Sequence, residues 1–458
     1  MAVKQRREFL KVQWGDESVP GTFVPATAVA GGLTDIRYRP DTTVNTPAKL
    51  NGSLAVANDV AILSKAGIVT LGGYATFEDM GYLLEMGYKH VAATGDGGSP
   101  QAYTRVWAPT LTQADDPHTK TVEVGTNAEA FRMPYSWCET FGLTARVKDF
   151  TNFTATIRGQ DFYPAAFTPS LTPHAISRIL GQKWKAFITP ADTGTMGGGE
   201  VLDCITDIAF NSGPLYMWAN CMNGLLTPES HVQQGQQPTA TVTFQLSPTS
   251  LQMLQDYLDG RKLFVRLLNE GDPIHGSTVV TPPATPLTGA VGAAGALTGT
   301  YSYKYTYVNQ YGETLPSAAT ASPVAATADQ INLSAITVSA DPSVIARRIY
   351  RTDATGTGTY KYVATINDNT TTTYIDNLID TDLGVAAPTA NTAISGTLVF
   401  NSFQIDLCAA ITAFPDVGQA VSEGSLSVPI TFTGTQDDGG SWGKLIEYTL
   451  VNELATLP

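Results

Sequence analysis

Hydrophobic and polar residues alternate with a period of two along much of the chain, which is the pattern of a half-buried β-strand. The clearest runs are rich in β-branched and aromatic residues and cover 141–158, 240–246, 263–268, 398–407 and 426–433. Gly, Pro, Asn and Asp separate these runs, as expected of turns between strands. The pattern therefore predicts a mainly β protein built from many short strands.

Helical periodicity is confined to a few segments. Thr76 precedes the run FEDMGYLLEMGY, so its hydroxyl can cap a helix that carries two acids in its first turn. A second helix is predicted over 247–260, closing on a glycine, and a shorter one over 173–181. A shift of 173 positions lays 68–91 over 241–264, and both segments read strand, capped helix, glycine, strand. This agreement predicts an internal duplication, although the apolar stripes of the two helices are not in phase.

The composition changes between 272 and 395. Segments rich in Pro, Gly and Ala, at 281–300 and 384–396, flank a region of short strands and are predicted to be linkers. The predicted strands cover 301–308, 330–334, 347–352, 360–366 and 371–375. About 100 residues of short strands and turns are typical of a small β-sandwich. Because the earlier strand pattern resumes after 396, this module is predicted to be inserted into the rest of the chain.

The module opens with four tyrosines at alternate positions: Tyr301, Tyr303, Tyr305 and Tyr307. Alternation puts their rings on one face of a strand. That face is either a stacking platform for bases or sugars or the side that packs against an opposing sheet. Packing is favoured, because a solvent-facing platform would bury Ser302, Lys304 and Thr306 instead. Any binding by the module is then expected at its loops, such as 309–315 and 353–359.

Charge and the termini narrow the range of functions. The formal net charge is −14, from 41 acidic and 27 basic residues, so the chain lacks the basic footprint that gripping nucleic acid requires. The first residues have no apolar core of a signal peptide, and no apolar run is long enough for a membrane span. Cys138, Cys204, Cys221 and Cys408 show no metal-binding spacing and are expected to be buried free thiols. Synthesis and first folding are expected in a cytoplasm.

No enzyme class and no cofactor is predicted. Asp192-Thr193-Gly194 is the tripeptide of an aspartic protease, but that chemistry needs a second such carboxylate and no second copy exists. No HExxH, phosphate-binding loop or GxSxG motif is found. A weak set of calcium candidates closes the module: Asp368, Asp376, Asp380 and Asp382. The alternative for these acids is an ordinary role as acceptors in turns.

Two stretches resemble a known family. The opening WGDESVPGTFVPATA, with Gly15, Glu17, Gly21 and Thr22, resembles the start of the major tail tube proteins of long-tailed, siphovirus-like bacteriophages. The closing segments 400–414 and 426–452 resemble the last strands of the same proteins. The module is similar to the fibronectin-III or immunoglobulin-like modules of phage structural proteins, through the strands Arg348–Thr352 and Thr373–Asp376.

The resemblance implies a tail-tube β-sandwich or barrel with flanking helices, duplicated and carrying an inserted immunoglobulin or fibronectin-III-like sandwich. Without residues 272–395 the chain keeps 334 residues, about twice one tube domain. The division expected is 1–180 for the first tube domain, 181–271 with 396–458 for the second, and 281–392 for the module. Two tube domains in one chain imply a trimeric ring with pseudo-sixfold symmetry; a hexameric ring is the alternative if the repeat is spurious.

Further expectations concern partners and place. Such a chain assembles with itself into stacked rings in the host bacterial cytoplasm and ends in the virion tail. It meets a tape measure protein inside the tube and terminator or tip proteins at its ends. Residues outside 272–395 carry 32 acids and 22 bases. A channel wall with this acidic excess is expected to repel the DNA that passes through, which it would not bind specifically.

Ring stacking is expected from two long loops, 40–66 and its counterpart 213–239. The candidate residues are Asp41, Lys49, Asn51, Tyr216, Trp218 and Leu225. Packing of the apolar members inside their own domain is the alternative. The competing function is an adhesive or decoration protein of a tail tip, capsid or pilus, whose sandwich binds cell-surface glycans.

Overall fold

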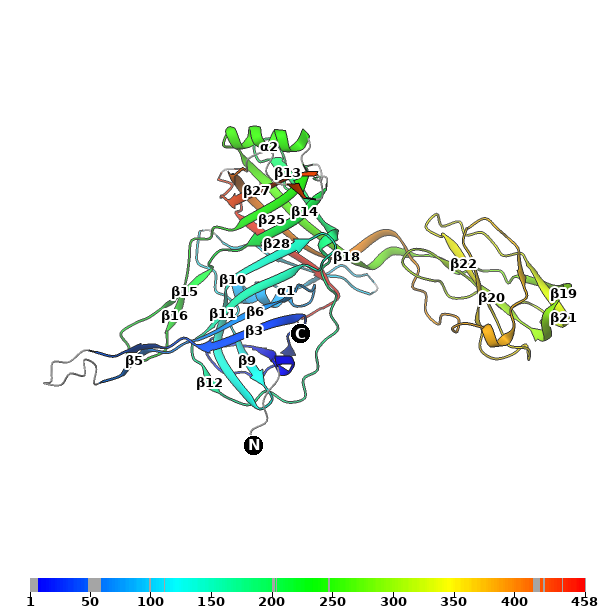
Figure 1. The fold of residues 1–458 in the computed structure, drawn as a ribbon, viewed down its shortest axis with the longest axis horizontal. Helices are drawn as coiled ribbons and strands as arrows, with labels where there is room; N and C mark the ends of the chain where they lie inside the picture. The colour runs from blue at the N-terminus through cyan, green and yellow to red at the C-terminus, as the bar shows by residue number, and fades with distance from the viewer. Residues whose placement is uncertain are drawn as a thin grey trace. The chain divides into compact units, whose positions relative to one another are not determined.

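The chain divides into two compact units in a computed structural model (Figure 1). The structure describes residues 7–47, 59–98, 100–110, 112–199, 202, 204–245, 248–414, 421–422, 425–438 and 440–457. The larger unit comprises Met1–Asp96, Ala102–Asp272 and Phe400–Pro458. The smaller unit comprises Gly97–Gln101 and Pro273–Val399. The protein is mainly β, as predicted, and none of its described helices is long and apolar enough to cross a membrane.

The larger unit contains two α-helices and most of the strands. Its first half holds β1 (Lys11–Asp16), β2 (Ala28–Val29), β3 (Leu33–Pro40), β4 (Thr43–Asn45), β5 (Ala61–Ser64), β6 (Gly67–Tyr74), α1 (Met80–Gly87), β7 (Thr94–Gly95), β8 (Tyr103–Trp107), β9 (Lys120–Thr126), β10 (Glu129–Arg146), β11 (Asn152–Gly159) and β12 (Tyr163–Pro164). Its second half holds β13 (Trp184–Pro190), β14 (Ile205–Asn211), β15 (Tyr216–Ala219), β16 (Ser230–Gln233), β17 (Thr239–Gln245), α2 (Pro248–Leu258), β26 (Val421–Ser422), β27 (Ser425–Gly434) and β28 (Ile446–Asn452). Two long strands, β18 (Lys262–Val279) and β25 (Ile394–Ala413), continue from this unit into the smaller one.

Antiparallel pairing joins most of these strands into one barrel-like network. One series of neighbours runs β3-β6-β11-β10-β14-β17-β27-β25-β28-β8-β7. A second series runs β2-β1-β9-β10-β12, so β10 belongs to both. The register of β10 with β9 shifts between Met133 and Ser136, and Tyr135 has a φ of 51°. This left-handed residue bends the strand, which lets its two ends join different sheets.

The same pairing scheme occurs in both halves of the larger unit. In the first half β6 pairs with β11 through Val69 and Ile157, and in the second β17 pairs with β27 through Val242 and Ile430. β1 pairs with β9 through Val12 and Val124, as β13 pairs with β18 through Lys185 and Leu268. The steps from Val69 to Val242 and from Val12 to Lys185 are both 173 positions.

The two longer predicted helices are present, and the third is not. Thr76 accepts a hydrogen bond from the backbone N–H of Asp79 at 3.0 Å, but α1 begins only at Met80 with Asp79 as its N-cap residue. The expected cap at Thr76 is therefore wrong, and Glu78 and Asp79 precede the helix instead of lying in its first turn. The chain leaves α2 through Gly260, whose φ of 62° suits a glycine after a helix. The helix expected over 173–181 is wrong: the segment is non-helical, and Ser177 and Ile179 bond to the backbones of Phe77 and Ala75.

The smaller unit is built from two three-stranded sheets that share one hydrophobic core. One sheet has the order β19 (Thr288–Tyr301), β21 (Val324–Ser334), β24 (Tyr374–Asp376), and the other β20 (Tyr303–Val308), β22 (Ala346–Arg351), β23 (Lys361–Ile366). All four alternating tyrosines are buried in the shared core, which excludes a solvent-facing stacking platform. The leading segment 281–300 is not only a linker, since most of it forms β19 and pairs with β21.

Buried arginines are a second feature of the smaller unit. Arg351 Nε lies 2.9 Å from Asp376 Oδ2, and both side chains are fully buried. Arg347 is equally buried and lies 2.9 Å from Asp368. Tyr303 donates a hydrogen bond to Asp376 at 2.8 Å, so the tyrosine row and this ion pair form one network. Buried charges need such pairing, because an unpaired charge in a core is strongly destabilising.

Candidate functional site

Two β-hairpins extend together from the same side of the larger unit (Figure 1). β4 pairs with β5 through Val44 and Ile62, and β15 pairs with β16 through Trp218 and His231. The N–H of Lys65, just after β5, donates to the carbonyl of Leu226, between β15 and β16, at 2.8 Å. We call residues 43–47 and 59–64 of the first hairpin and 216–233 of the second the paired arms. The two loops predicted to mediate stacking thus meet in one surface feature.

The paired arms expose many large apolar side chains. These are Val44, Val60, Ile62, Leu63, Met217, Met222, Leu225, Leu226 and Val232. Met222 is fully exposed and Leu225 is 62% exposed. Exposed apolar side chains gathered on two adjoining hairpins are candidates for a site of interaction, whereas scattered single apolar residues are not. Two-stranded hairpins are also only marginally stable alone in water, so a partner surface would stabilise them.

Aromatic packing fixes the base of the second arm. Tyr216 is fully buried, with its ring 5.6 Å from Trp137, and donates a hydrogen bond to the carbonyl of Asp115 at 3.3 Å. Trp218 is half-buried and packs edge-on against Trp137 at 5.2 Å. Of the three apolar candidates, Leu225 therefore faces solvent, while Tyr216 and Trp218 anchor the arm to its own domain.

Asp41 fixes the base of the first arm. Its backbone exchanges hydrogen bonds with Ala66 at 2.7 and 3.1 Å, and its carboxylate lies 2.8 Å from Arg158. The other two polar candidates, Lys49 and Asn51, lie outside the described residues. Asp41 thus attaches the base of the first arm to the barrel through Ala66 and Arg158.

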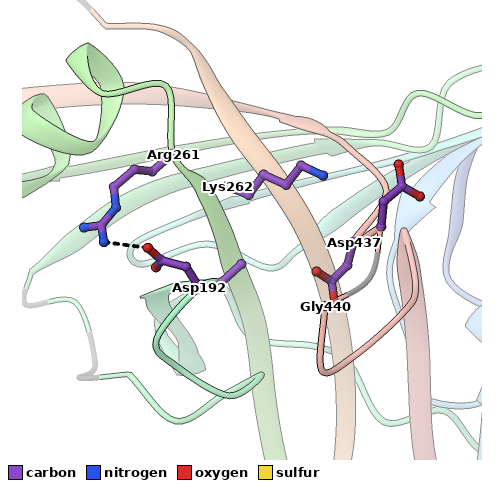
Figure 2. Close-up of a pocket in the computed structure, with 7 residues that line it drawn as sticks. Asp192, Arg261, Lys262, Asp437 and Gly440 are labelled. Atoms are coloured by element: carbon purple, nitrogen blue, oxygen red, sulfur yellow. Dashed lines mark hydrogen bonds and ion pairs between the residues drawn. The ribbon is translucent and has the colours of Figure 1, made fainter.

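Asp192 of the protease-like tripeptide lines an open cleft of about 310 Å³ (Figure 2). The other lining residues are Ala191, Arg261, Lys262, Asp437, Asp438 and Gly440. Figure 2 shows the Asp192 carboxylate turned toward Arg261, 2.8 Å away. This hydrogen bond lowers the pKa of Asp192, which opposes the shared proton of an acid protease. Asp437 is buried and accepts N–H groups of its own loop, from Trp442 and Gly443.

The four aspartates proposed for calcium are engaged by other groups. Asp376 and Asp380 both contact Arg351, at 2.9 and 2.6 Å. Asp368 accepts the backbone N–H groups of Thr370 and Thr371, which is the turn role considered as the alternative. Asp382 lies in a short 3-10 helix, Asp380–Asp382, with its side chain toward solvent.

The cysteines differ from expectation in their exposure. All four are free thiols, and Cys138 and Cys408 are buried, but Cys204 and Cys221 are exposed. Spacing along the chain gives no information about exposure in the loops that carry these two residues.

A cluster of Glu85, His90 and His118 was missed at the sequence level. Each can offer one ligand atom, and these atoms lie within 4.8 Å of one another. Among the residues that the structure describes, this is the one group of three such side chains. No sequence motif predicts this cluster, since His90 and His118 are separated along the chain by a segment that contains β7 and β8. No protein-family model matches the chain, and no curated protein matches it either.

Proposed function

We propose that this chain is a structural subunit of a bacteriophage tail tube, which assembles with itself into stacked rings around a central channel. The observation that carries the proposal is the pair of arms, because they present apolar side chains on hairpins that project from the barrel. Ring stacking requires such reach toward the next subunit. Burial of these side chains between subunits would supply about 25 cal/mol for each Å² of apolar surface removed from water.

The repeated strand pairing supports two tube domains in one chain. Both β1 to β13 and β6 to β17 are related by the same step of 173 positions, with equivalent partners. Pairing of β10 with β14 joins the first half to the second within one continuous sheet. Three such chains would give a ring with pseudo-sixfold symmetry, and six chains remain the alternative.

The charge supports a conduit that does not hold DNA. The chain carries an excess of 14 acidic charges, which every subunit repeats around the ring. Acidic and hydroxyl-bearing walls repel phosphate and leave DNA mobile. We assign the inserted sandwich to the outside of the tube, since a folded module in the channel would obstruct passage. No catalytic role is part of the proposal.

The test is the assembly of purified, untagged protein, followed by negative-stain electron microscopy and sedimentation velocity. Stacked rings with a central channel are expected. In the double variant Met222→Asp with Leu225→Asp, two charges enter the exposed arm surface, so stacking should be lost while the fold is kept. Val147→Asp is the control, because Val147 is 46% exposed on the turn between β10 and β11 and is not a residue of the arms.

A chain that stays monomeric at all concentrations, or assembly that the double variant leaves unchanged, would contradict the proposal. Far-UV circular dichroism of each variant checks that lost assembly is not lost folding. The ring copy number, three or six, follows from the mass of isolated rings.

One observation favours adhesion as the second candidate function. The smaller unit contains a cleft of about 480 Å³ whose lining includes the hydroxyl groups of Thr285, Thr337 and Ser339. Hydroxyl and carboxylate groups in a partly apolar cleft suit a sugar ligand. A glycan array probed with the full chain tests this function. Specific glycan binding without any ring assembly would favour adhesion over the tube.

A further inference from the structure

The strongest unassigned cluster lies at the end of α1. Glu85 belongs to the last turn of α1, His90 follows the helix, and His118 precedes β9. The backbone N–H of His118 donates to the carbonyl of Glu85 at 3.0 Å, so two distant segments are fixed against each other. The Glu85 side chain is only 3% exposed, whereas His118 is 22% and His90 64% exposed.

Both imidazoles approach the same carboxylate, one at each oxygen. His90 Nδ1 lies 3.0 Å from Glu85 Oε1, and His118 Nδ1 lies 3.4 Å from Glu85 Oε2. The two rings lie 5.0 Å apart, inclined by 64°. Ligands of a tetrahedral Zn²⁺ with bonds of about 2.0–2.1 Å are separated by about 3.3 Å. The 3.0 Å from His90 Nδ1 to Glu85 Oε1 is close to this separation, and one ligand atom of each of the three residues lies within 4.8 Å of the other two.

We propose that Glu85, His90 and His118 bind a divalent transition-metal ion, with Zn²⁺ as the best match to two imidazoles and one carboxylate. This donor set excludes ions that require oxygen alone, such as Ca²⁺ and Mg²⁺. Three protein ligands leave one coordination position open on the side of the exposed His90, for water or a group from another molecule. The site is independent of the tail-tube proposal, since it lies at the end of α1 and just before β9 and uses no residue of the paired arms.

Lys120 sets the charge balance of the site. Its side chain is buried, its Nζ lies 3.4 Å from Glu85 Oε2, and it also contacts Asp16. Oε2 is thus shared by Lys120 and His118, so we assign Oε1, which faces His90, to the ion. Asp16 offsets the lysine charge, and Asp115, 3.7 Å from Lys89, adds another acid nearby.

The experiment is a titration of the full-length, untagged chain with Zn²⁺ alone, after chelator treatment, by isothermal calorimetry. Binding of Co²⁺ alone is followed by visible absorption, which reports a tetrahedral N and O ligand set directly. One equivalent of metal per chain is expected. His90→Ala and His118→Ala should each weaken binding by at least about tenfold, the lower end of the loss seen even for outer-shell changes.

His174→Ala is the matched control, because His174 lies 3.4 Å from Asp79 in another histidine–carboxylate pair outside the cluster. It should bind metal like the unmodified chain. His90 is exposed, so His90→Ala should fold like the unmodified chain. Glu85→Gln changes a buried group, so this variant is used only if its circular dichroism spectrum is unchanged. The proposal is overturned if the unmodified chain binds no stoichiometric metal, or if both cluster variants bind as tightly as it does. The second result would reduce the cluster to contacts between Glu85 and the two histidines.

Discussion

The two helices α1 and α2 follow equivalent strands, β6 and β17, but their surroundings are opposite. All eight residues of α1 are buried. Near the end of α2, Tyr257 is 39% and Leu258 is 68% exposed. Asp79, the N-cap residue of α1, makes no side-chain cap hydrogen bond, and each helix has a glycine near its end, Gly87 as the last residue of α1 and Gly260 shortly after α2. What differs is the presence of a second layer of protein over the helix.

The C-terminal segment supplies that layer for α1. A Cβ on Gly81 would lie 2.6 Å from the Leu457 side chain, so the backbone of α1 and the tail are in close contact. The Asn452 side chain donates to the carbonyl of Phe77 at 2.9 Å, just before the helix. The Arg105 guanidinium donates to the carbonyls of Leu454 and Ala455, at 2.8 and 3.0 Å. A helix of given sequence thus becomes a core helix or a surface helix according to what the rest of the chain lays over it.

Leu84→Ala should have the largest effect, because it deletes a buried side chain within the main hydrophobic cluster. We expect a loss of about 2–5 kcal/mol in the free energy of unfolding. The matched change Leu258→Ala in α2 should alter it by less than about 0.5 kcal/mol. Urea denaturation of the two variants measures the contrast. Equal losses would show that α2 is covered in solution.

Removal of residues 454–458 should have a smaller effect. The change takes two carbonyl acceptors from the buried Arg105, so a loss of about 1–3 kcal/mol is expected. Asp192→Ala is the comparison on the α2 side, since Asp192 is exposed and bonds to Arg261 just after α2, and little measurable change is expected. Thermal and urea unfolding of both variants provide the measurement. A truncated chain as stable as the full one would mean that the tail does not hold α1.

The start of α1 should also make stability depend weakly on pH. A hydrogen bond to Asp79, with the charges of Asp79 and Glu78, raises the pKa of His174 above its ordinary value, against the effect of burial. The stabilisation from a group with a raised folded pKa is fully present below the unfolded pKa, about 6.5 for histidine. This stabilisation is lost as the pH rises through the pKa of the folded state. Urea unfolding at pH 5.5, 7 and 8.5 should show this loss, and His174→Gln should lack it. At each pH the free energy of unfolding of the variant is subtracted from that of the unmodified chain, so the contributions of the other histidines cancel.

Thiol labelling should report the same contrast without changing stability. Cys138 packs beneath the end of α1, 3.8 Å from a Cβ placed on Gly87, and burial raises its pKa to about 12. Cys204 is exposed, and its carbonyl accepts from Gln245, shortly before α2. With Cys221 and Cys408 replaced by Ser, a neutral disulfide reagent should label Cys204 at once and Cys138 only on unfolding. Rapid labelling of Cys138 would indicate that α1 opens readily.

Sequence patterns predicted the elements whose formation depends on neighbouring residues in the chain. Period-two runs identified strands such as β17 and β27, and helical periodicity located α1, although Thr76 does not cap it. The helix expected over 173–181 failed because the backbones of Ser177 and Ile179 bond to distant residues. The 281–300 segment failed as a pure linker because Gly and Ala give no side-chain period, although the backbone from Thr288 onward pairs with β21, with irregularities between Val291 and Thr298. Long-range backbone pairing leaves no mark in such sequences.

The candidate sites likewise divide into features that the sequence predicts and features that only the tertiary fold determines. Long polar loops with apolar residues indicated the arms, but only the structure separates the exposed Leu225 from the buried Tyr216. His118 meets Glu85 because its segment is bonded to the end of α1, which no spacing rule expresses. Exposure and convergence depend on the tertiary fold, so sequence patterns locate candidates without showing which of them meet.

The smaller unit leaves and re-enters the larger one at neighbouring positions. The Asn401 side chain donates to the carbonyl of Asp272 at 3.3 Å, so the two points where the chain crosses between units are held together by the host fold itself. An insert at such a place adds little loop-closure entropy, because its ends are already joined. Recombination could therefore add, exchange or remove a whole module here while the barrel keeps every strand, and a protein engineer could graft a different cargo domain at the same junction.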